Sequence, residues 1–386
     1  LTRTVLVLSF VSLLADIASE MLYPVIPVYL REVGFSVLLI GLLEGIAEFT
    51  AGLSKGYFGK RSDELGLRLP FVRAGYLLSA LSKPMMALRT WPVWIFSART
   101  LDRLGKGLRT AARDALLSRE ATPATKARIF GFHRGMDTLG AVLGPSIALA
   151  YLAWHPAQYR SLFYVALVPG LLAFLLIFLL RERREVASTL PPGNFFSFFR
   201  YWAVAGPGYR RVVAGLLLFA LFNSSDVFLL LKTKEITGSD TITLLAYIFY
   251  NLVFALAAFP AGMLADRIGM RTVFVGGLLV FAGVYGGFAL HPGRIGVFAL
   301  FLLYGFYAAA TDGIAKAWIT NLAHRQNTAT AVGFYTSGQS VCSLLASTVA
   351  GLLWSRFGSA ATFWVAAGGA ALTWLYFLVP VPADKN

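Results

Sequence analysis

The sequence contains little cysteine, few charged residues and few acids. Its single cysteine, Cys342, excludes an intrachain disulfide and a cysteine-based metal cluster. Only 14% of the 386 residues are charged, 57% are hydrophobic and the mean hydropathy is +0.68, more apolar than soluble domains. Lys and Arg (34) outnumber Asp and Glu (19), which leaves a net charge of +15. Nucleic-acid-binding proteins of this charge are much less apolar, so the composition predicts a membrane protein that binds no nucleic acid.

Twelve apolar stretches have the length of about 20 residues that a helix needs to cross the hydrocarbon of a bilayer. The first carries Asp16 and Glu20 and continues to Leu30 without a small-residue cleavage pattern, so we expect a retained span and not a signal peptide. The predicted spans begin near Thr4, Val37, Phe71, Trp91, Ile129, Leu162, Val212, Thr243, Val273, Ile295, Thr330 and Ala361. The sequence therefore predicts an all-α polytopic membrane protein.

One connection, Arg181 to Arg211, is long, charged at both ends and rich in proline. We therefore predict an N-terminal six-helix bundle over residues 1–182, a cytoplasmic linker over 183–208 and a C-terminal six-helix bundle over 209–386. Basic residues concentrate in the linker and in alternate loops, and the positive-inside rule places these loops and both termini in the cytoplasm. Most of the excess positive charge is thus explained by topology.

An internal repeat relates the two halves. The sequence GKRSDELGLR, starting at Gly59, matches GMLADRIGMR, starting at Gly262, at both glycines, the aspartate and the arginine, 203 positions further along. Parallel repeats of this kind are typical of transporters whose site lies between the halves.

This pattern, Gly-x-x-x-Asp-x-x-Gly-x-Arg, resembles the signature loop of the major facilitator superfamily. The second copy is a near-ideal match, whereas the first has Glu64 where the family usually has Arg. The resemblance covers the whole chain and implies twelve transmembrane helices in two pseudo-symmetric six-helix bundles, secondary transport without a cofactor, and a location in the bacterial inner membrane; we expect a monomer. It also implies a cytoplasmic gating latch formed by Gly59, Asp63, Arg68, Gly262, Asp266, Arg267 and Arg271.

The fifth predicted span contains Gly131, Gly140 and Gly144-Pro145, a spacing that resembles the antiporter signature of superfamily exporters. Its tail differs, because Ala148-Leu149 stands where two glycines often follow. Glycines on one face permit close helix approach and a proline introduces a kink. We therefore assign Gly140, Gly144 and Pro145 to gating and favour export.

Charged residues inside predicted spans are costly and usually face a cavity or a partner. In the fourth span Arg99, Lys106 and Arg113 recur every seven residues. We predict that Arg99, Arg103 and Lys106 bind an anionic group, with Asp102 either sharing this site or neutralising Arg103 or Lys106. Arg109 and Arg113 are expected at the cytoplasmic mouth as solvated helix-end residues.

Further substrate-binding candidates lie in the fifth span: His133, Arg134 and Asp137. For Arg134 with Asp137, and for Asp312 with Lys316, an intrahelical salt bridge is the favoured interpretation. His133 lacks an obvious set of metal-ligating partners, so no metal site is predicted.

Carboxylates at membrane depth with acidic neighbours are candidates for proton exchange. Asp16 and Glu20, four residues apart on one helix face, are the first choice. The second choices are Glu44, Glu48 and Asp226.

The sequence thus supports the hypothesis of a proton-coupled transporter that exports a small organic solute, anionic or zwitterionic, by alternating access. Three alternatives stay open: an importer of the same fold, a cation or metal transporter, and a polytopic enzyme that acts on lipid headgroups.

Overall fold

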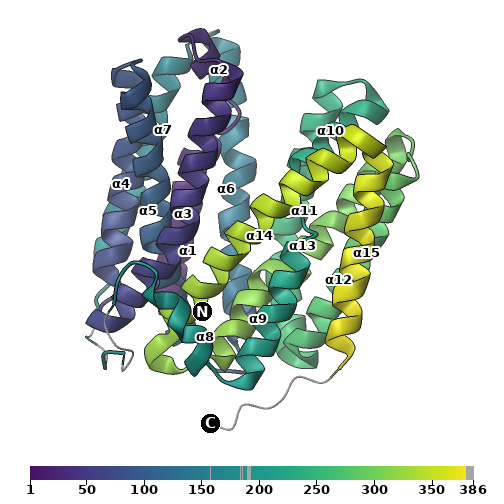
Figure 1. Cartoon of the computed structure of the whole chain (residues 1–386). Coiled ribbons are helices and arrows are strands. Elements are labelled where there is room, and N and C mark those ends of the chain that lie inside the picture. The colour runs from purple at the N-terminus through teal and green to yellow at the C-terminus, as the bar shows by residue number, and fades with distance from the viewer. Residues whose placement is uncertain (157, 183, 185, 189–192, 380–386) are drawn as a thin grey trace. The chain divides into compact units, whose positions relative to one another are not determined.

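The computed structural model describes residues 1–156, 158–182, 184, 186–188 and 193–379, and these form helices without strands (Figure 1). Residues 183, 185 and 189–192 of the predicted linker lie outside the described residues. The helices are α1 (Arg3–Glu20), α2 (Ile26–Glu32), α3 (Val37–Leu65), α4 (Leu69–Leu88), α5 (Pro92–Arg119), α6 (Lys126–Trp154), α7 (Tyr159–Leu176), η1 (Ile177–Leu179), η2 (Ser197–Arg200), α8 (Tyr201–Val204), α9 (Pro207–Ala220), α10 (Val227–Thr237), α11 (Asp240–Ile268), α12 (Met270–Ala289), α13 (Arg294–Leu322), η3 (Arg325–Asn327), α14 (Thr328–Phe357) and α15 (Ser359–Leu378). The predicted all-α fold is confirmed.

Each predicted span contains a helix that starts within five residues of the predicted position. The first and seventh spans are each divided into two helices, α1 with α2 and α9 with α10. The breaks fall at Met21–Val25 and Leu221–Asp226, which are corresponding positions in the two halves. Interrupted spans at equivalent places are a structural indication of transporter binding sites, because the break frees backbone polar groups at membrane depth.

The repeated sequence pattern is mostly helical, although it resembles a signature loop. Helix α3 continues to Leu65 and α11 to Ile268. Each helix then ends at the second glycine of the pattern, Gly66 with φ +63° and Gly269 with φ +97°. Glycine adopts these angles without steric cost, which makes the connection to the next helix very short.

Two compact units make up the chain. Unit 1 comprises Leu1–Glu120, Met136–Tyr201 and His324–Ser337, and unit 2 comprises Ala121–Gly135, Trp202–Ala323 and Gly338–Asn386. Each unit therefore combines most of one sequence half with the first part of a helix from the other half, α14 in unit 1 and α6 in unit 2. The division at residues 182 and 209 stays a prediction.

Helix packing within the two units follows one scheme. In unit 1, α5 packs on α3 and α4, and α7 packs on α1 and α4. In unit 2, α13 packs on α11 and α12, and α15 packs on α9 and α12. The α4–α5 contact is backbone to backbone, since a Cβ at Gly75 would lie 2.6 Å from the carbonyl oxygen of Gly105. The same internal packing in both units is what two copies of one six-helix bundle require.

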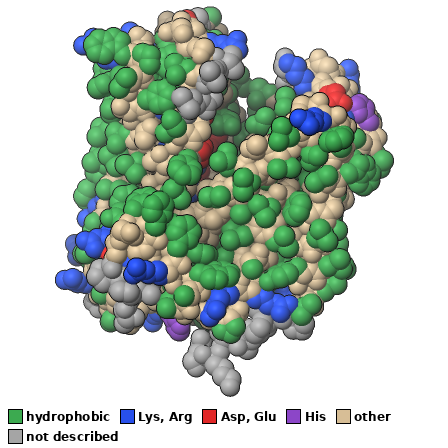
Figure 2. Space-filling view, in the orientation of Figure 1, with side chains coloured by type: hydrophobic (Ala, Val, Ile, Leu, Met, Phe, Trp, Pro, Cys, Tyr) green, Lys and Arg blue, Asp and Glu red, His purple; other side chains and the backbone are tan. Residues whose placement is uncertain are grey.

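Hydrophobic side chains are widespread on the outer surface (Figure 2). Large apolar residues such as Val168, Leu256, Leu352 and Leu372 are more than half exposed. Among the described residues, seven helices are long and apolar enough by themselves to cross a membrane: α6, α7 with η1, and α11 to α15. The other predicted spans include α3 and α5, which carry the charges of the candidate site. The exposed apolar surface suits contact with lipid.

Candidate functional site

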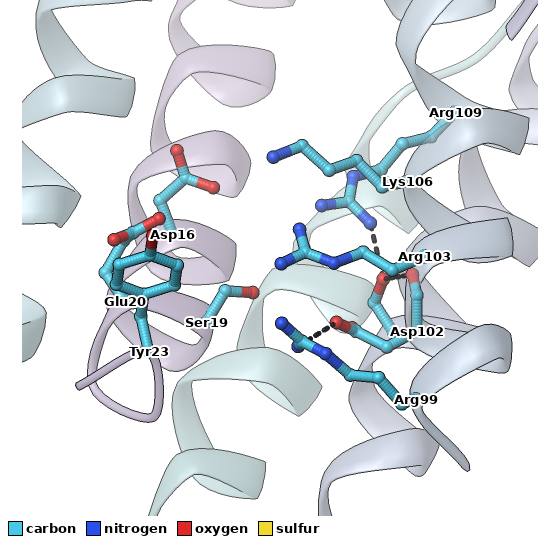
Figure 3. A pocket seen from close by; sticks show the side chains of 10 residues that line it. Asp16, Ser19, Glu20, Tyr23, Arg99, Asp102, Arg103, Lys106 and Arg109 are labelled. Atoms are coloured by element: carbon cyan, nitrogen blue, oxygen red, sulfur yellow. Dashed lines mark hydrogen bonds and ion pairs between the residues drawn. The ribbon is translucent and has the colours of Figure 1, made fainter. Parts of the chain in front are cut away.

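A polar pocket lies inside unit 1 where α1 faces α5. Its lining consists of Asp16, Ser19, Glu20 and Tyr23 from α1 and the turn after it, Ser79 from α4, and Arg99, Asp102, Arg103, Lys106 and Arg109 from α5. Figure 3 shows the acids of α1 on one side of the pocket and the basic side chains of α5 on the other. The structure thus brings together the first-choice proton residues and the predicted anion-binding residues.

Two of the arginines pair with acids of α3. The Arg99 guanidinium donates from Nε to Glu44 Oε1 at 2.8 Å and from Nη2 to Glu44 Oε2 at 2.7 Å. Arg103 Nη1 lies 3.0 Å from Glu48 Oε1. Forked arginine–carboxylate contacts of this kind are strong and directional. An anionic solute that binds either arginine therefore has to displace a carboxylate of the protein or share the arginine with it.

Asp102 is surrounded by two cations and a hydroxyl. Its carboxylate lies 3.4 Å from Lys83 Nζ and 3.4 Å from Arg99 Nη1, and it accepts a hydrogen bond from Ser82 Oγ at 3.3 Å. The sequence left two interpretations of Asp102 open, and its ion pairs with Lys83 and Arg99 do not match the neutralisation of Arg103 or Lys106. Lys83 was missed, although a lysine inside the apolar stretch of α4 was a visible signal. Asp102 thus has a structural role in the wall of the pocket.

Lys106 and Arg103 both extend from α5 toward α1 (Figure 3). Within the described part of the chain the ammonium of Lys106 forms no ion pair, and it lies close enough to Asp16 and Glu48 for their charges to interact. Figure 3 shows the side chain extended across the pocket toward Asp16. Of the predicted anion-binding residues, Lys106 is the one that a ligand reaches without breaking an ion pair of the protein.

The expectation that Arg109 and Arg113 are solvated helix-end residues is wrong. Both are buried, with exposed fractions of 4% and 7%. Arg109 Nη1 donates to Ser79 Oγ at 2.6 Å, and its guanidinium lies over the Tyr76 ring at 4.4 Å. Helix α5 extends to Arg119, so these side chains lie inside unit 1 well before the helix end. Their burial is possible because each has hydrogen-bonding or aromatic partners.

The charged residues of α6 divide between the two units. Arg134 Nε pairs with Asp312 Oδ2 of α13 at 2.5 Å, inside unit 2. Asp137, inside unit 1, accepts a hydrogen bond from Ser12 Oγ at 2.5 Å, one helical turn before Asp16 on α1. His133 is buried. Arg134 of α6 and Asp312 of α13 therefore pair with each other. From the sequence we had favoured a partner within the same helix for each, Asp137 for Arg134 and Lys316 for Asp312.

The glycines of α6 bring it against α1, as their spacing predicted. A Cβ at Gly140 would lie 2.8 Å from Leu13 O and 2.8 Å from Asp16 Cβ, and one at Gly144 would lie 2.7 Å from Met21 N. Such distances are shorter than real Cβ contacts, so the two helices meet backbone to backbone only because these residues lack a side chain. The helix runs through Pro145 without interruption.

Both aspartates of the repeated pattern bind the start of a helix. In unit 1, Asp63 accepts from Thr330 N at 2.7 Å and Thr330 Oγ1 at 2.9 Å, at the beginning of α14, and pairs with Arg68 at 3.1 Å. In unit 2, Asp266 accepts from Ala127 N at 3.0 Å and from Arg128 N and Nε at 3.1 Å, at the beginning of α6. A carboxylate at a helix start satisfies free N–H groups and interacts favourably with the helix dipole.

The first glycines of the two patterns have equivalent roles, whereas the arginines differ: Arg68 pairs with Asp63, and Arg271 binds carbonyl oxygens. A Cβ at Gly59 would lie 2.5 Å from Ala329 O, and one at Gly262 would be similarly close to Ala127 O. Each first glycine therefore permits the helix start to approach. Arg271 donates to the carbonyl oxygens of Phe377 and Leu378 at the end of α15. These are the kinds of contact that the latch of the resembled family would make.

The sequence model of the Major Facilitator Superfamily matches residues 8–248 and 212–386. The chain belongs to this superfamily. An uncharacterised MFS-type transporter of Methanocaldococcus jannaschii is 33% identical over 363 residues, which are 92% of this chain and 89% of that protein. The chain is therefore a multi-pass membrane transporter and not an enzyme, which excludes the alternative of an enzyme acting on lipid headgroups.

Other major facilitator proteins share the fold or part of the sequence. The quinolone resistance protein NorA of Staphylococcus aureus is 26% identical over 189 residues, about half of each chain (49% and 48%). The crystal structure of the human organic anion transporter MFSD10 has a TM-score of 0.83 at 18% identity and covers 97% of this chain and 99% of its own. The fucose:proton symporter FucP of E. coli has a TM-score of 0.79 at 14% identity, with 97% of each chain covered. At these identities the two structures show the fold alone.

Asp226, a second choice for proton exchange, is the last residue of the break between α9 and α10. The carboxylate of Asp226 accepts a hydrogen bond from Tyr250 Oη and another from Tyr304 Oη, each 2.6 Å long. The tyrosines come from α11 and α13, and sequence reasoning missed both. Aromatic residues are frequent throughout these spans, so nothing in the sequence separates the two that meet Asp226.

Proposed function

We propose that this transporter exports a small zwitterionic organic solute across the bacterial inner membrane in exchange for protons, with both termini in the cytoplasm. The observation that carries the proposal is the pocket of unit 1, where the acids Asp16 and Glu20 face the basic residues Arg103 and Lys106. A zwitterion has the complementary charges: its carboxylate binds the basic wall and its ammonium group binds the acidic wall.

Coupling by exchange requires that solute and proton compete for the same groups. An ammonium group at Asp16 or Glu20 lowers the affinity of these carboxylates for a proton, and a proton lowers their affinity for the ammonium group, because the coupling is reciprocal. A purely anionic solute would instead bind more tightly once an acid is protonated, which favours movement of both in one direction. Export in exchange for protons therefore favours the zwitterion over the pure anion.

Two similarities support this proposal. The partial relative NorA is named for resistance to quinolones, which is consistent with export, and its similarity covers about half of this chain. The antiporter-like glycines Gly140 and Gly144 pack α6 on α1, the helix that carries the acids of the pocket. We assign gating to the contacts of Asp63 and Asp266 with helix starts, through which alternating access would be controlled.

A cation or metal transporter is less well supported. Glu44 and Glu48, whose carboxylates could otherwise bind a cation, pair with Arg99 and Arg103. Among the described residues, no group of three or more His, Cys, Asp or Glu side chains is arranged to hold a metal ion.

The proposal is tested with the full chain in liposomes preloaded with a zwitterionic fluoroquinolone or with its N-acylated derivative, which is only an anion. We expect an inward proton gradient to accelerate efflux of the zwitterion and not of the anion. Asp16→Asn should abolish the effect of the gradient while exchange of labelled for unlabelled solute persists. The control Glu32→Gln, which changes an exposed acid at the end of α2 outside the pocket, should behave as wild type.

The results separate the alternatives. Gradient-driven uptake of the anion together with protons would identify an importer. Efflux of the zwitterion that is independent of the gradient, or that is unchanged in Asp16→Asn, would contradict proton exchange at Asp16. If Lys106→Ala and Arg103→Ala both leave thermal stabilisation by the solute intact, the basic wall does not bind it.

A further inference from the structure

Asp16 and Asp137 meet because α6 touches α1. Gly140, three residues after Asp137, lies so close to α1 that a Cβ there would be 2.8 Å from Asp16 Cβ. One helical turn separates Gly140 from Asp137 on the same face of α6, so the carboxyl group of Asp137 is presented to this part of α1. Asp137 also accepts a hydrogen bond at 2.5 Å from Ser12 Oγ, one helical turn before Asp16 on α1, so the carboxyl groups of Asp16 and Asp137 lie next to each other.

Two ionised carboxylates cannot form a hydrogen bond, since both are acceptors only and their charges repel. A contact between two carboxyl groups at this distance is stable when exactly one of them carries a proton, which it then donates to the other. Aspartate pairs that share one proton in this way are well known in protein interiors. The α1–α6 contact therefore favours a bound proton.

The surrounding hydrogen bonds indicate which carboxyl group is ionised. Ser12 Oγ donates its only hydrogen to Asp137 Oδ1 at 2.5 Å. The same oxygen accepts from Arg113 Nη1 at 3.0 Å, so the hydroxyl cannot turn its hydrogen elsewhere. Arg113 is held in turn by Asp114, 3.1 Å away. These hydrogen bonds favour the ionised form of Asp137, so we assign the proton to Asp16, which lines the pocket.

We propose that Asp16 and Asp137 form a carboxyl pair that holds the exchanged proton, with Asp137 as its permanently ionised member. The inference rests on the proposed proton exchange. The pair of Asp16 and Asp137 takes the place of the pair of Asp16 and Glu20, which was the first choice from the sequence. The charged and titratable groups around the pair are Glu20 on α1, Tyr76 on α4, and Lys106, Arg113 and Asp114 on α5.

The pair explains how solute and proton exclude each other. When an ammonium group enters the pocket beside Asp16, it neutralises the negative charge that the proton otherwise neutralises, and the proton leaves. When the ammonium group departs, Asp16 again lies next to the ionised Asp137, and repulsion between the two carboxylates favours uptake of a proton. Asp137 is thus a positioning residue that acts through Asp16 and does not need to touch the solute.

The test uses infrared difference spectroscopy on the full chain in lipid nanodiscs, with the stretching band of protonated carboxyl groups followed as pH is changed. The wild type should show a band that disappears on titration, and Asp16→Asn should lack it. In Asp137→Asn the midpoint should move toward lower pH by about one to three units, since the neighbouring negative charge is gone. Glu20→Gln should shift it less than Asp137→Asn does.

A second variant keeps the proposal testable if Asp137→Asn does not fold. Ser12→Ala removes the hydrogen bond that keeps Asp137 ionised, so the midpoint should move toward higher pH. The proposal is overturned if Asp16→Asn retains the band, if neither Asp137→Asn nor Ser12→Ala moves the midpoint, or if Glu20→Gln has the larger effect.

Measurements of solute efflux under a proton gradient separate the two proposals. Suppose that the infrared band shifts as expected and that efflux by the wild type is the same with and without a proton gradient. This outcome would reject proton exchange and retain the carboxyl pair. Gradient-driven efflux whose pH dependence is identical in wild type and Asp137→Asn would reject the pair and retain proton exchange.

Discussion

Replacing Asp102 by Asn should destabilise unit 1 strongly, because it leaves a buried lysine without its counter-ion. The substitution keeps the size of the side chain and removes only its charge. Lys83 has an exposed fraction of 4%, and Asp102 is its ion-pair partner at 3.4 Å. The hydrogen bond from Lys83 Nζ to Ser79 O, 2.9 Å long, would persist but supplies only a partial charge.

The magnitude follows from what each cation retains. Removing one partner of a buried ion pair typically costs about 3–5 kcal/mol. Arg99 keeps its two hydrogen bonds to Glu44, so the loss concerns mainly Lys83. We therefore expect a decrease of about 3 kcal/mol in the free energy of unfolding, the lower end of that range.

The assay is denaturant-induced unfolding of the purified protein in detergent, followed by tryptophan fluorescence, for Asp102→Asn, Lys83→Met and the double variant. The double variant should be more stable than Asp102→Asn alone, because Lys83→Met removes the unpaired charge and fills its place with an apolar side chain. Asp312→Asn, in a pair whose side chains are about one-third exposed, serves as control and should cost about 1 kcal/mol or less. A double variant no more stable than Asp102→Asn would refute the reasoning that the cost arises from Lys83.

Three further predictions concern helix contacts and ion pairs elsewhere. Gly140→Leu should lower the free energy of unfolding in urea by about 1–3 kcal/mol, because the leucine side chain would separate α6 from α1. Gly276→Leu is the control: a Cβ added there meets nothing within 4 Å, so the free energy of unfolding should change by about 0.5 kcal/mol or less. Asp63→Asn should cost about 3–5 kcal/mol by the same measurement, since it removes the carboxylate that pairs with the buried guanidinium of Arg68; an unaltered unfolding midpoint would contradict this. Near the end of α10, burial raises the pKa of Glu235, but hydrogen bonds from Lys232 and Ser359 outweigh it and lower the pKa overall. The stability that this provides is present above the ordinary pKa of Glu and is lost as pH falls through the lowered value, so Lys232→Met should flatten the acid side of a plot of stability against pH.

Much of the architecture was predictable because it depends on short stretches of sequence. A span is recognised by about 20 neighbouring residues, and a helix end by a glycine such as Gly66. The repeated pattern around Asp63 and Asp266 was equally visible. The same local reasoning failed for Arg109 and Arg113, whose burial depends on Tyr76, Ser79 and Ser12 from other helices.

The sequence by itself determined the all-α fold, the twelve spans, the internal repeat and which residues carry charge inside the membrane. Only the tertiary structure decided how those charges are paired. Glu44 meets Arg99 across 55 residues, Lys83 meets Asp102 across 19, and Asp137 meets Ser12 across 125. The physical reason is that the partner of a side chain depends on which helix faces come into contact, and contacts such as that of Gly140 with α1 arise from the packing of whole helices.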